Sequence, residues 1–395
     1  MTILFLSYWG INEGLTESTV LPHVRILAED CQAKVLLVSI ERSNFTTPTL
    51  PQNVLHVPLQ SKGKKNVILT KIQDFLTFPQ AIIKLCRRHQ VDLIMCRSSL
   101  AGALGYLVWR RTRIPYTVES FEPHAAYMIE SGVWGKYDLR YWSQLIFEKV
   151  QRKTATWILP VSKQFANHLI KSGTPASKII TMPCCLRVSE FAFSKNDRIS
   201  QRELLAIPAE AIVGIYAGKF GGIYYEKEAF ELFKLSLNHF GKNFYLILLT
   251  DYPLNSVAER LREIGFPENR VIVDFVKRKQ VPKYLSAADF AYSFYKKTPS
   301  KRYLSPIKIG EYWANGLPVL IEDGIGDDAA IVQAEGGGII YDMMNLKPEF
   351  GYLEKSLEIG RENLARQIVR LAIKYRDLQR VNTSYAKILR NCKFG

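Results

Sequence analysis

The stretch from Ser305 to Asp328, SPIKIGEYWANGLPVLIEDGIGDD, constrains the fold most because it combines a helix start, a short amphipathic helix and a buried strand. Ser305 is a preferred N-cap residue, and Pro306 suits the first helical position, where its missing N–H would have no partner. We expect Gly316 to end the helix and residues 317–321 to form the next strand. The unpartnered N–H groups of such a helix start attract anions.

Three polar residues of this helix, Lys308, Glu311 and Asn315, fall on one face at spacings of three and four. A cation beside the helix start and a carboxylate one turn deeper can hold the pyrophosphate and the ribose hydroxyls of one nucleotide. The alternative is a solvated Lys–Glu pair, which stabilises a helix by roughly 0.2–0.5 kcal/mol. Spacing alone leaves both interpretations open.

The same stretch resembles the donor-site signature of the retaining glycosyltransferases of family 4, Pro-x-Lys-x-x-Glu-Tyr-x-Ala-x-Gly-x-Pro-Val. The matching residues are Pro306, Lys308, Glu311, Tyr312, Ala314, Gly316, Pro318 and Val319. Many members carry a second Glu eight positions before the first, where this chain has Tyr303. Whether this difference alters or removes activity is open from the sequence.

The resemblance implies an α/β protein of the GT-B fold, with two Rossmann-like, doubly wound parallel-sheet domains facing a central cleft. It also implies transfer of a sugar from a nucleotide-diphosphate sugar to an acceptor hydroxyl, with retention of configuration and with neither a cofactor nor a metal. The nucleotide sugar is then the donor substrate. The donor-binding residues that it implies are Gly218, Lys219, Ser305, Pro306, Ile307, Lys308 and Glu311.

Apolar segments recur along both halves of the chain and predict parallel strands that are covered on both faces. We expect them near 2–8, 34–41, 53–58, 91–97, 115–119, 156–162, 178–183, 211–216, 244–248, 271–273, 290–293, 317–321 and 338–340. The polar, irregular stretch 185–210 is the expected hinge. The predicted domains are 1–188 for the acceptor and 189–372 for the nucleotide sugar, and a C-terminal helix, 373–395, returns to the first domain by resemblance.

The segment Gly218-Lys219 follows a predicted strand, so its backbone can approach a ligand while Lys219 supplies charge. It resembles the family segment whose cation contacts the donor diphosphate, and the alternative is an ordinary glycine turn. A Lys provides a point charge rather than a bidentate fork, which is enough for a phosphate. We therefore include Lys219 among the expected catalytic residues.

Three strand-end loops of the first half are candidates for the acceptor side. Glu119, Glu122 and His124 place three titratable groups within six residues, which can position or deprotonate an acceptor hydroxyl. We expect His124 and Glu122 to be catalytic, although a Glu–His pair can also simply anchor a loop. The expected acceptor-side residues are Asn12, Gly14, Arg97 and Glu119. The remaining histidines lack metal-ligand spacing, so we expect no metal site.

The formal net charge is +16, and residues 1–190 hold 23 Lys and Arg against 13 Asp and Glu. Basic groups occur at Lys62-Lys64-Lys65, Lys84-Arg87-Arg88 and Arg110-Arg111-Arg113. This excess favours an anionic partner, and solvated helix faces are the alternative. With Trp109 and Trp142 near basic residues, we expect a glycan or lipid-linked acceptor and peripheral contact with an anionic membrane.

Cysteine usage and the N-terminus favour a cytoplasmic protein, because the six cysteines show no C-x-x-C spacing and residues 1–7 look like a strand rather than a secretory signal. Three rival functions stay open. They are a nucleotide-sugar epimerase of the same architecture, a non-catalytic nucleotide-sugar sensor or scaffold, and a nucleic-acid-binding protein. No nucleic-acid motif is present, so we expect no nucleic-acid partner. The donor's base and sugar, the acceptor linkage and the oligomeric state are not determined by the sequence.

Overall fold

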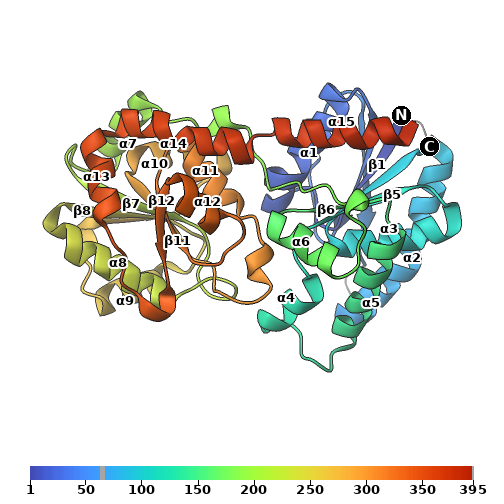
Figure 1. The fold of residues 1–395 in the computed structure, drawn as a ribbon, viewed down its shortest axis with the longest axis horizontal. Helices are drawn as coiled ribbons and strands as arrows, with labels where there is room; N and C mark the ends of the chain where they lie inside the picture. Colours follow the sequence, from blue (N-terminus) through green and yellow to red (C-terminus); the bar gives the residue numbers. More distant parts are fainter. Residues whose placement is uncertain (63–66, 394–395) are drawn as a thin grey trace. The chain divides into compact units, whose positions relative to one another are not determined.

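The computed structural model describes residues 1–62 and 67–393, and the chain divides into two compact units (Figure 1). Unit 1 joins Met1–Cys185 to Leu378–Gly395, and unit 2 is Leu186–Asp377. The chain therefore passes between units at Cys185–Leu186 and again at Asp377–Leu378, a few residues from the boundaries expected at 188 and 372.

Unit 1 contains a six-stranded parallel sheet with the order β3-β2-β1-β4-β5-β6. The strands are β1 (Thr2–Ser7), β2 (Lys34–Glu41), β3 (Val54–Gln60), β4 (Leu93–Arg97), β5 (Tyr116–Ser120) and β6 (Trp157–Pro160). The strand order reverses between β1 and β4. In open sheets of this type, ligands bind beyond the carboxyl ends of the strands at such a switch point.

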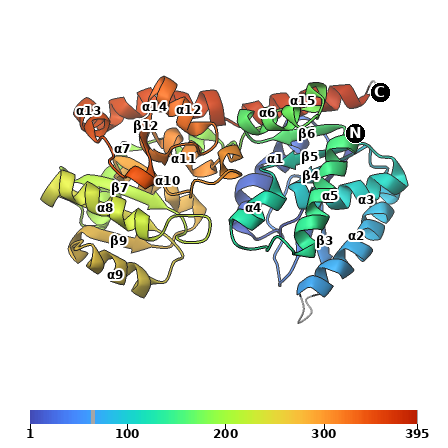
Figure 2. The same ribbon diagram turned by 60° about the horizontal axis from the view of Figure 1, so that its bottom comes forward.

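Helices cover both faces of this sheet. They are η1 (Thr16–Val20), α1 (Leu21–Arg25), η2 (Ile26–Asp30), α2 (Val67–His89), α3 (Ser99–Thr112), α4 (His124–Glu130), α5 (Leu139–Thr154), α6 (Lys163–Lys171), η3 (Ala176–Lys178) and α15 (Gln379–Lys393). The helix α3 packs against both α2 and α5 (Figure 2). The last helix, α15, contributes Val381 and Tyr385 to the core that also contains Ile3 and Phe5.

Unit 2 repeats the architecture with the strand order β12-β11-β10-β7-β8-β9, again all parallel. Its strands are β7 (Ile212–Ala217), β8 (Phe244–Leu249), β9 (Val271–Asp274), β10 (Phe290–Ser293), β11 (Val319–Glu322) and β12 (Gly338–Tyr341). The order reverses between β7 and β10. Two parallel, doubly wound sheets confirm the fold class predicted from the sequence.

The helices of unit 2 lie on both sides of its sheet, with α8 and α9 on one side and α10, α11 and α14 on the other (Figure 1). The unit contains η4 (Val188–Phe191), α7 (Lys195–Leu204), α8 (Lys227–Phe240), η5 (Gly241–Asn243), α9 (Leu254–Glu263), η6 (Glu268–Arg270), η7 (Arg278–Gln280), α10 (Val281–Ala287), η8 (Lys301–Tyr303), α11 (Ile307–Asn315), α12 (Asp328–Glu335), η9 (Met343–Asn345), α13 (Gly351–Ile359) and α14 (Arg361–Arg376).

Alternate strand residues build the two cores of unit 2. Val213 and Ile215 of β7 face the core that contains Trp313 of α11, whereas Tyr216 faces the core that contains Phe233 of α8. Every second side chain of a strand points to the same face. The continuous apolar runs in the sequence follow from this burial of both faces.

Three local predictions were wrong. Residues 178–183 form no strand, since only a single bridge joins Ile179 to Ile158 and β6 already ends at Pro160. The stretch 185–210 is not irregular, because it contains α7, which Ser194 caps through a hydrogen bond from the Asp197 N–H. The C-terminal helix expected at 373–395 starts later, at Gln379, because residues up to Arg376 belong to α14 and Asp377 separates α14 from α15.

Two further expectations concern charge and membranes. No helix in residues 1–62 or 67–393 is long and apolar enough to cross a membrane. In the basic group Lys62-Lys64-Lys65, Lys62 is exposed, and the other two lie outside the described residues.

Candidate functional site

The helix α11 begins at Ile307, and its N-cap is Pro306 rather than the expected Ser305. Ser305 is buried, and its hydroxyl accepts a hydrogen bond from Arg376, which also pairs with Asp328. The guanidinium therefore holds the hydroxyl that would otherwise cap the helix. The N-cap residue Pro306 makes no side-chain hydrogen bond to the first turn of α11, and the N–H groups of a helix start attract anions.

Lys308 lies in this first turn and reaches back over Gly218, the residue after β7. A Cβ built at Gly218 would collide with the Lys308 ammonium nitrogen and would lie 2.7 Å from the Tyr216 hydroxyl oxygen. The Lys308 ammonium also lies 5.6 Å from the centre of the Tyr216 ring and 5.1 Å from that of Tyr224. The structure thus brings the predicted residues Gly218 and Lys308 together at the switch point between β7 and β10.

Glu311 lies one turn deeper in α11 and is buried, yet it does not face a purely apolar core. Its Oε1 atom is 2.5 Å from Nη1 of Arg278, and the Arg278 side chain is 26% exposed. The Arg278 guanidinium also lies over the Phe191 ring, 5.0 Å from its centre. The carboxylate is therefore at the edge of the site, where one arginine holds it.

Lys219 does not join this group. Its ammonium pairs with Asp251 at 3.0 Å, and the two side chains are 70% and 43% exposed. The Lys219 carbonyl instead accepts a hydrogen bond from the Tyr216 hydroxyl at 2.5 Å, which fixes the turn after β7. An exposed pair of this kind contributes little to stability.

The position of α11 depends on close packing against α14. A Cβ at Gly316 would collide with Ala365, and Gly316 has a φ of +75°, which suits glycine. At Gly310, a Cβ would lie 2.7 Å from Leu186 and 3.1 Å from Arg376. Both glycines allow the helix backbone to approach its neighbours.

In unit 1, His124 and Glu122 form the pair that the sequence predicted. Nδ1 of His124 lies 2.9 Å from Oε1 of Glu122, and the two side chains are 19% and 10% exposed. The His124 ring packs edge-on against Trp134 and stacks on Tyr127. Because a hydrogen bond to one ring nitrogen sets the role of the other, Glu122 orients the imidazole.

Arg97 and Glu119, predicted as acceptor-side residues, form a buried ion pair with each other. Glu119 also accepts a hydrogen bond from the Tyr385 hydroxyl of α15 at 2.6 Å, and that hydroxyl is 2.7 Å from Nδ1 of His23. Burial and Arg97 lower the pKa of His23 well below its usual value, so His23 is neutral near pH 7. These groups link the C-terminal helix to the strand ends of unit 1.

Asn12 and Gly14 lie on the loop after β1, and both are exposed. Asn12 exchanges two hydrogen bonds with the backbone of Thr46, at 2.7 and 2.8 Å, which connects two loops of the same edge. Of the described residues, none lies within 4 Å of a Cβ built at Gly14. These two residues therefore do not contact the Arg97–Glu119 pair through any bond that the structure shows.

Metal-ligand geometry is absent from the described part of the chain, where no group of three or more His, Cys, Asp or Glu side chains could hold an ion. The thiols of Cys31, Cys86, Cys96 and Cys392 are free. That the activity needs no metal stays a prediction.

Sequence reasoning missed three arginines that build the site. Arg278 pairs with Glu311, Arg376 holds Ser305, and Arg361 binds the other end of α11. For Arg278, the basic run Lys277-Arg278-Lys279 that follows a predicted strand indicated a possible site residue. The other two lie on a helix that looks like an ordinary charged surface helix in sequence.

Two parallel doubly wound units, each with a switch point in its strand order, define the GT-B fold, which the chain shares with glycosyltransferases of known structure. The chain is similar to the sucrose-phosphate synthase of Thermosynechococcus elongatus, with a TM-score of 0.76 and 15% identity over 99% of this chain and 98% of that one. It is also similar to Anabaena HepE solved with UDP, with a TM-score of 0.73 and 15% identity over 99% of this chain and 100% of that one.

A third similar structure is WaaG, described as a glycosyltransferase involved in lipopolysaccharide biosynthesis, with a TM-score of 0.68 and 16% identity over 98% of this chain and 99% of that one. Residues 30–190 match the sequence model of Glycosyltransferase Family 4. The resemblance to this family is thus confirmed. No curated protein sequence matches the chain.

Proposed function

We propose that this protein is a retaining glycosyltransferase that moves a sugar from a nucleotide-diphosphate sugar to an acceptor hydroxyl. The observation that carries the proposal is the position of the Lys308 ammonium over Gly218, in the first turn of α11 and beyond the end of β7. A diphosphate bound there receives a positive charge and backbone N–H donors from the same helix. HepE, which shares the fold, has been solved with UDP and with UDP-glucose.

In this mechanism, negative charge grows on the diphosphate as the glycosidic bond to the donor breaks. Lys308 and the N–H groups of α11 stabilise that charge without a catalytic metal, because they already point to the place where it develops. Lys219 adds a second cation once a ligand draws it from its exposed contact with Asp251. Glu311, positioned by Arg278, accepts hydrogen bonds from the ribose hydroxyls.

On the acceptor side, His124 is the group that contacts the attacking hydroxyl, and Glu122 positions its ring. No protein nucleophile is required, since the departing phosphate oxygen assists attack on the same face of the sugar. Because the acceptor hydroxyl attacks the face from which the diphosphate departs, the configuration at the anomeric carbon is retained. The acceptor is a surface polysaccharide or a lipid-linked glycan.

We further propose that the protein works at the cytoplasmic face of a membrane, docked through one apolar surface of unit 1. This surface, the α2/α5 patch, comprises the exposed side chains Leu69, Ile72, Leu76, Leu139, Trp142 and Ile146. On each helix they occupy positions i, i+3 and i+7, hence one face. The two helices meet where the Phe75 and Phe147 rings lie 5.9 Å apart.

Charge complementarity selects an anionic bilayer as the occupant of the α2/α5 patch. The exposed cations Lys136 and Lys149 flank it, and its carboxylate Asp138 is already paired with Arg140 at 2.5 Å. Basic residues around an apolar, tryptophan-bearing face are typical of interfacial binding. Trp109 is not part of this surface, because it packs against Tyr106 and under Arg113.

The test of the donor site is calorimetric titration with UDP, GDP and ADP, followed by transfer assays with the matching nucleotide sugars. For the nucleotide that binds, we expect Lys308→Met to raise Kd by at least about tenfold, or 1.4 kcal/mol. Glu311→Gln should weaken binding in the same direction. Lys355→Met, an exposed lysine of α13, is the control and should leave Kd unchanged.

Each alternative predicts a different result in the same assays. An epimerase would convert the nucleotide sugar with no acceptor present, and a non-catalytic binder would bind it without turnover. NMR of the product tests retention through the anomeric configuration. Normal nucleotide affinity in both Lys308→Met and Glu311→Gln would refute the proposed site.

A further inference from the structure

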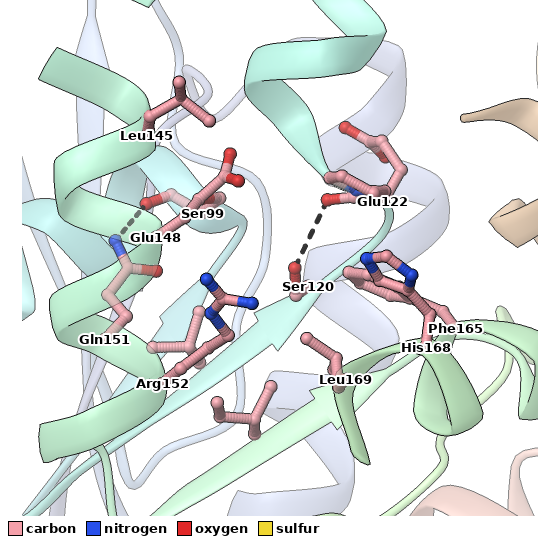
Figure 3. Close-up of a pocket in the computed structure, with 13 residues that line it drawn as sticks. Ser99, Ser120, Glu122, Leu145, Glu148, Gln151, Arg152, Phe165, His168 and Leu169 are labelled. Carbon is pink, nitrogen blue, oxygen red and sulfur yellow. Dashed lines mark hydrogen bonds between the residues drawn. The ribbon is translucent and has the colours of Figure 1, made fainter. Parts of the chain in front are cut away.

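A cavity of about 180 Å³ lies between α5 and α6 in unit 1, beside the ends of β5 and β6 (Figure 3). It touches the proposed acceptor site only through Glu122, and its other lining residues have no role there. The volume is below the roughly 300–1,000 Å³ of pockets for drug-sized ligands. The cavity therefore suits a group about the size of one sugar ring.

The side chain of Arg152 points into this cavity from α5 (Figure 3). It is half-buried, and among residues 1–62 and 67–393 it has no hydrogen-bond or ion-pair partner. The buried arginines Arg202 and Arg376, by contrast, each pair with a carboxylate. A guanidinium has five N–H donors in a planar fork that matches a carboxylate, so this cavity offers an unfilled site for an anion.

Glu148 cannot fill that site, although it lines the same cavity one helical turn away. Its Oε1 atom accepts hydrogen bonds from the Ala125 N–H at 2.9 Å and from the Gln144 amide at 3.1 Å. These donors hold the carboxyl group beyond ion-pair distance from Arg152. Within the described chain Oε2 of Glu148 has no partner, and it is available to a ligand hydroxyl.

Two other features of the wall fit a sugar rather than a bare anion. Among the described residues, the Ser120 hydroxyl makes a single long hydrogen bond, 3.5 Å, to the Glu122 carbonyl, and it can turn to a ligand. The cavity is also lined by the apolar side chains Val118, Ile158 and Leu169. A pyranose ring presents hydroxyls at its edge and C–H groups on its faces, which matches both surfaces.

The charges of the cavity restrict the anion to a single negative charge. Arg152 is its one cation other than the histidine, whereas Glu122 and Glu148 supply two carboxyl groups. A second negative charge on a ligand would be repelled wherever either of these carboxyl groups is ionised. A sugar carboxylate satisfies Arg152 with one charge, and a phosphate brings nearly two.

We propose that this cavity binds one uronic-acid residue, with the sugar carboxylate on Arg152, its hydroxyls on Glu148 and Ser120, and its ring against Leu169. The proposal that the cavity binds this sugar depends only on the residues that line the cavity. The further statement that this residue belongs to the acceptor rests on the proposed glycosyltransferase function. The cavity then selects acceptors that carry an acidic sugar.

The test is a ligand-observed NMR titration of the full chain with D-glucuronate, its uncharged methyl ester, glucose and glucose 6-phosphate. We expect glucuronate to bind, and the ester and glucose to bind at least about tenfold more weakly. Arg152→Gln should weaken glucuronate binding by a similar factor. Lys153→Gln, which changes the neighbouring exposed residue of α5, should bind as the unchanged protein does.

Three outcomes would overturn the proposal: no glucuronate binding by the unchanged protein, equal binding of the methyl ester, or unchanged binding in Arg152→Gln. Tighter binding of glucose 6-phosphate than of glucuronate would assign the cavity to phosphate and would also contradict it. Thermal unfolding checks that Arg152→Gln is folded. Nucleotide titration of the same samples tests the donor site separately, so a failure of one proposal is distinguishable from a failure of the other.

Discussion

Arg361 binds the C-terminal end of α11 through Asn315, whose backbone oxygen accepts a hydrogen bond at 2.8 Å and whose side-chain oxygen accepts another at 2.6 Å. The same guanidinium donates to the Gly316 carbonyl at 3.1 Å. A cation at a helix C-terminus interacts favourably with the helix dipole. Since Arg376, at the other end of α14, holds Ser305, one helix fixes both ends of the helix that bears Lys308 and Glu311.

Arg361→Gln should therefore reduce both stability and nucleotide binding. The substitution leaves several carbonyl groups at the end of α11 without a donor, and we expect a loss of about 3 kcal/mol of unfolding free energy. Urea denaturation measures it. The control is Arg366→Gln on the same helix, an exposed residue paired with Glu362, which should change stability by less than about 0.5 kcal/mol. Similar losses in both variants would contradict this role of Arg361.

The sequence predicted the parallel strands and the end of α11 because each depends on local properties. Strands buried on both faces appear as continuous apolar runs, and Gly316 adopts the positive φ of a helix C-cap. The predicted N-cap at Ser305 failed because its hydroxyl is held by Arg376, 71 positions away. No local pattern reports a contact of that separation.

In the candidate site, too, the residues within a local motif were predicted, and those that act through distant contacts were not. Gly218, Lys308 and Glu311 were identified because a family motif places them, whereas Arg278 and Arg361 act through contacts between segments far apart in sequence. Arg97 and Glu119 were correctly placed at strand ends. Their burial could not be foreseen, since the partner Tyr385 is 266 residues from Glu119.

Gly218→Ala tests the close approach of Lys308 to the end of β7. The added methyl group would collide with the ammonium and displace it from the diphosphate site, so we expect nucleotide Kd to rise by about tenfold. Calorimetric titration measures this change. Gly351→Ala is the matched control, because no described residue lies within 4 Å of its Cβ position and its φ is not positive. Unchanged affinity in Gly218→Ala would place the phosphate elsewhere.

Tyr385→Phe separates a structural role of Glu119 from contact with an acceptor. The variant removes the hydroxyl that donates to Glu119, and leaving a buried carboxylate short of a donor costs about 1–3 kcal/mol. We expect lower stability in denaturant unfolding and an unchanged KM for the acceptor. An acceptor KM that rises while stability stays constant would instead indicate that Glu119 contacts the acceptor.

Charged substitutions in the α2/α5 patch test membrane docking. Leu139 is 81% exposed and Trp142 is 54% exposed, so the double variant Leu139→Asp, Trp142→Asp should fold normally. We expect its co-sedimentation with phosphatidylglycerol vesicles to fall by at least about tenfold, while binding to neutral phosphatidylcholine vesicles is weak for both proteins. Leu204→Asp, at an equally exposed position of α7, is the control. Equal sedimentation of the double variant would assign the patch to another partner, such as a second copy of the chain.

Glu322 gives unit 2 a pH-dependent stability. It ends β11, is buried, and accepts a hydrogen bond from the Met343 N–H at 3.0 Å. Burial raises its pKa from 4.5 to about 7. The native state therefore binds more protons than the unfolded chain between these values, so its stabilising contribution is complete below pH 4.5 and is lost as pH rises through 7.

From this shift, the unchanged protein should lose up to about 3 kcal/mol of unfolding free energy across that pH window because of Glu322 alone. In Glu322→Gln, which keeps an acceptor for Met343 and cannot ionise, this part of the pH dependence should disappear, and the variant should be the more stable protein above pH 7. Glu358→Gln, an exposed residue of α13, should keep the original slope. Urea denaturation at a series of pH values measures all three proteins, and parallel stability curves for the unchanged protein and Glu322→Gln would show that Glu322 is ionised in the folded state throughout.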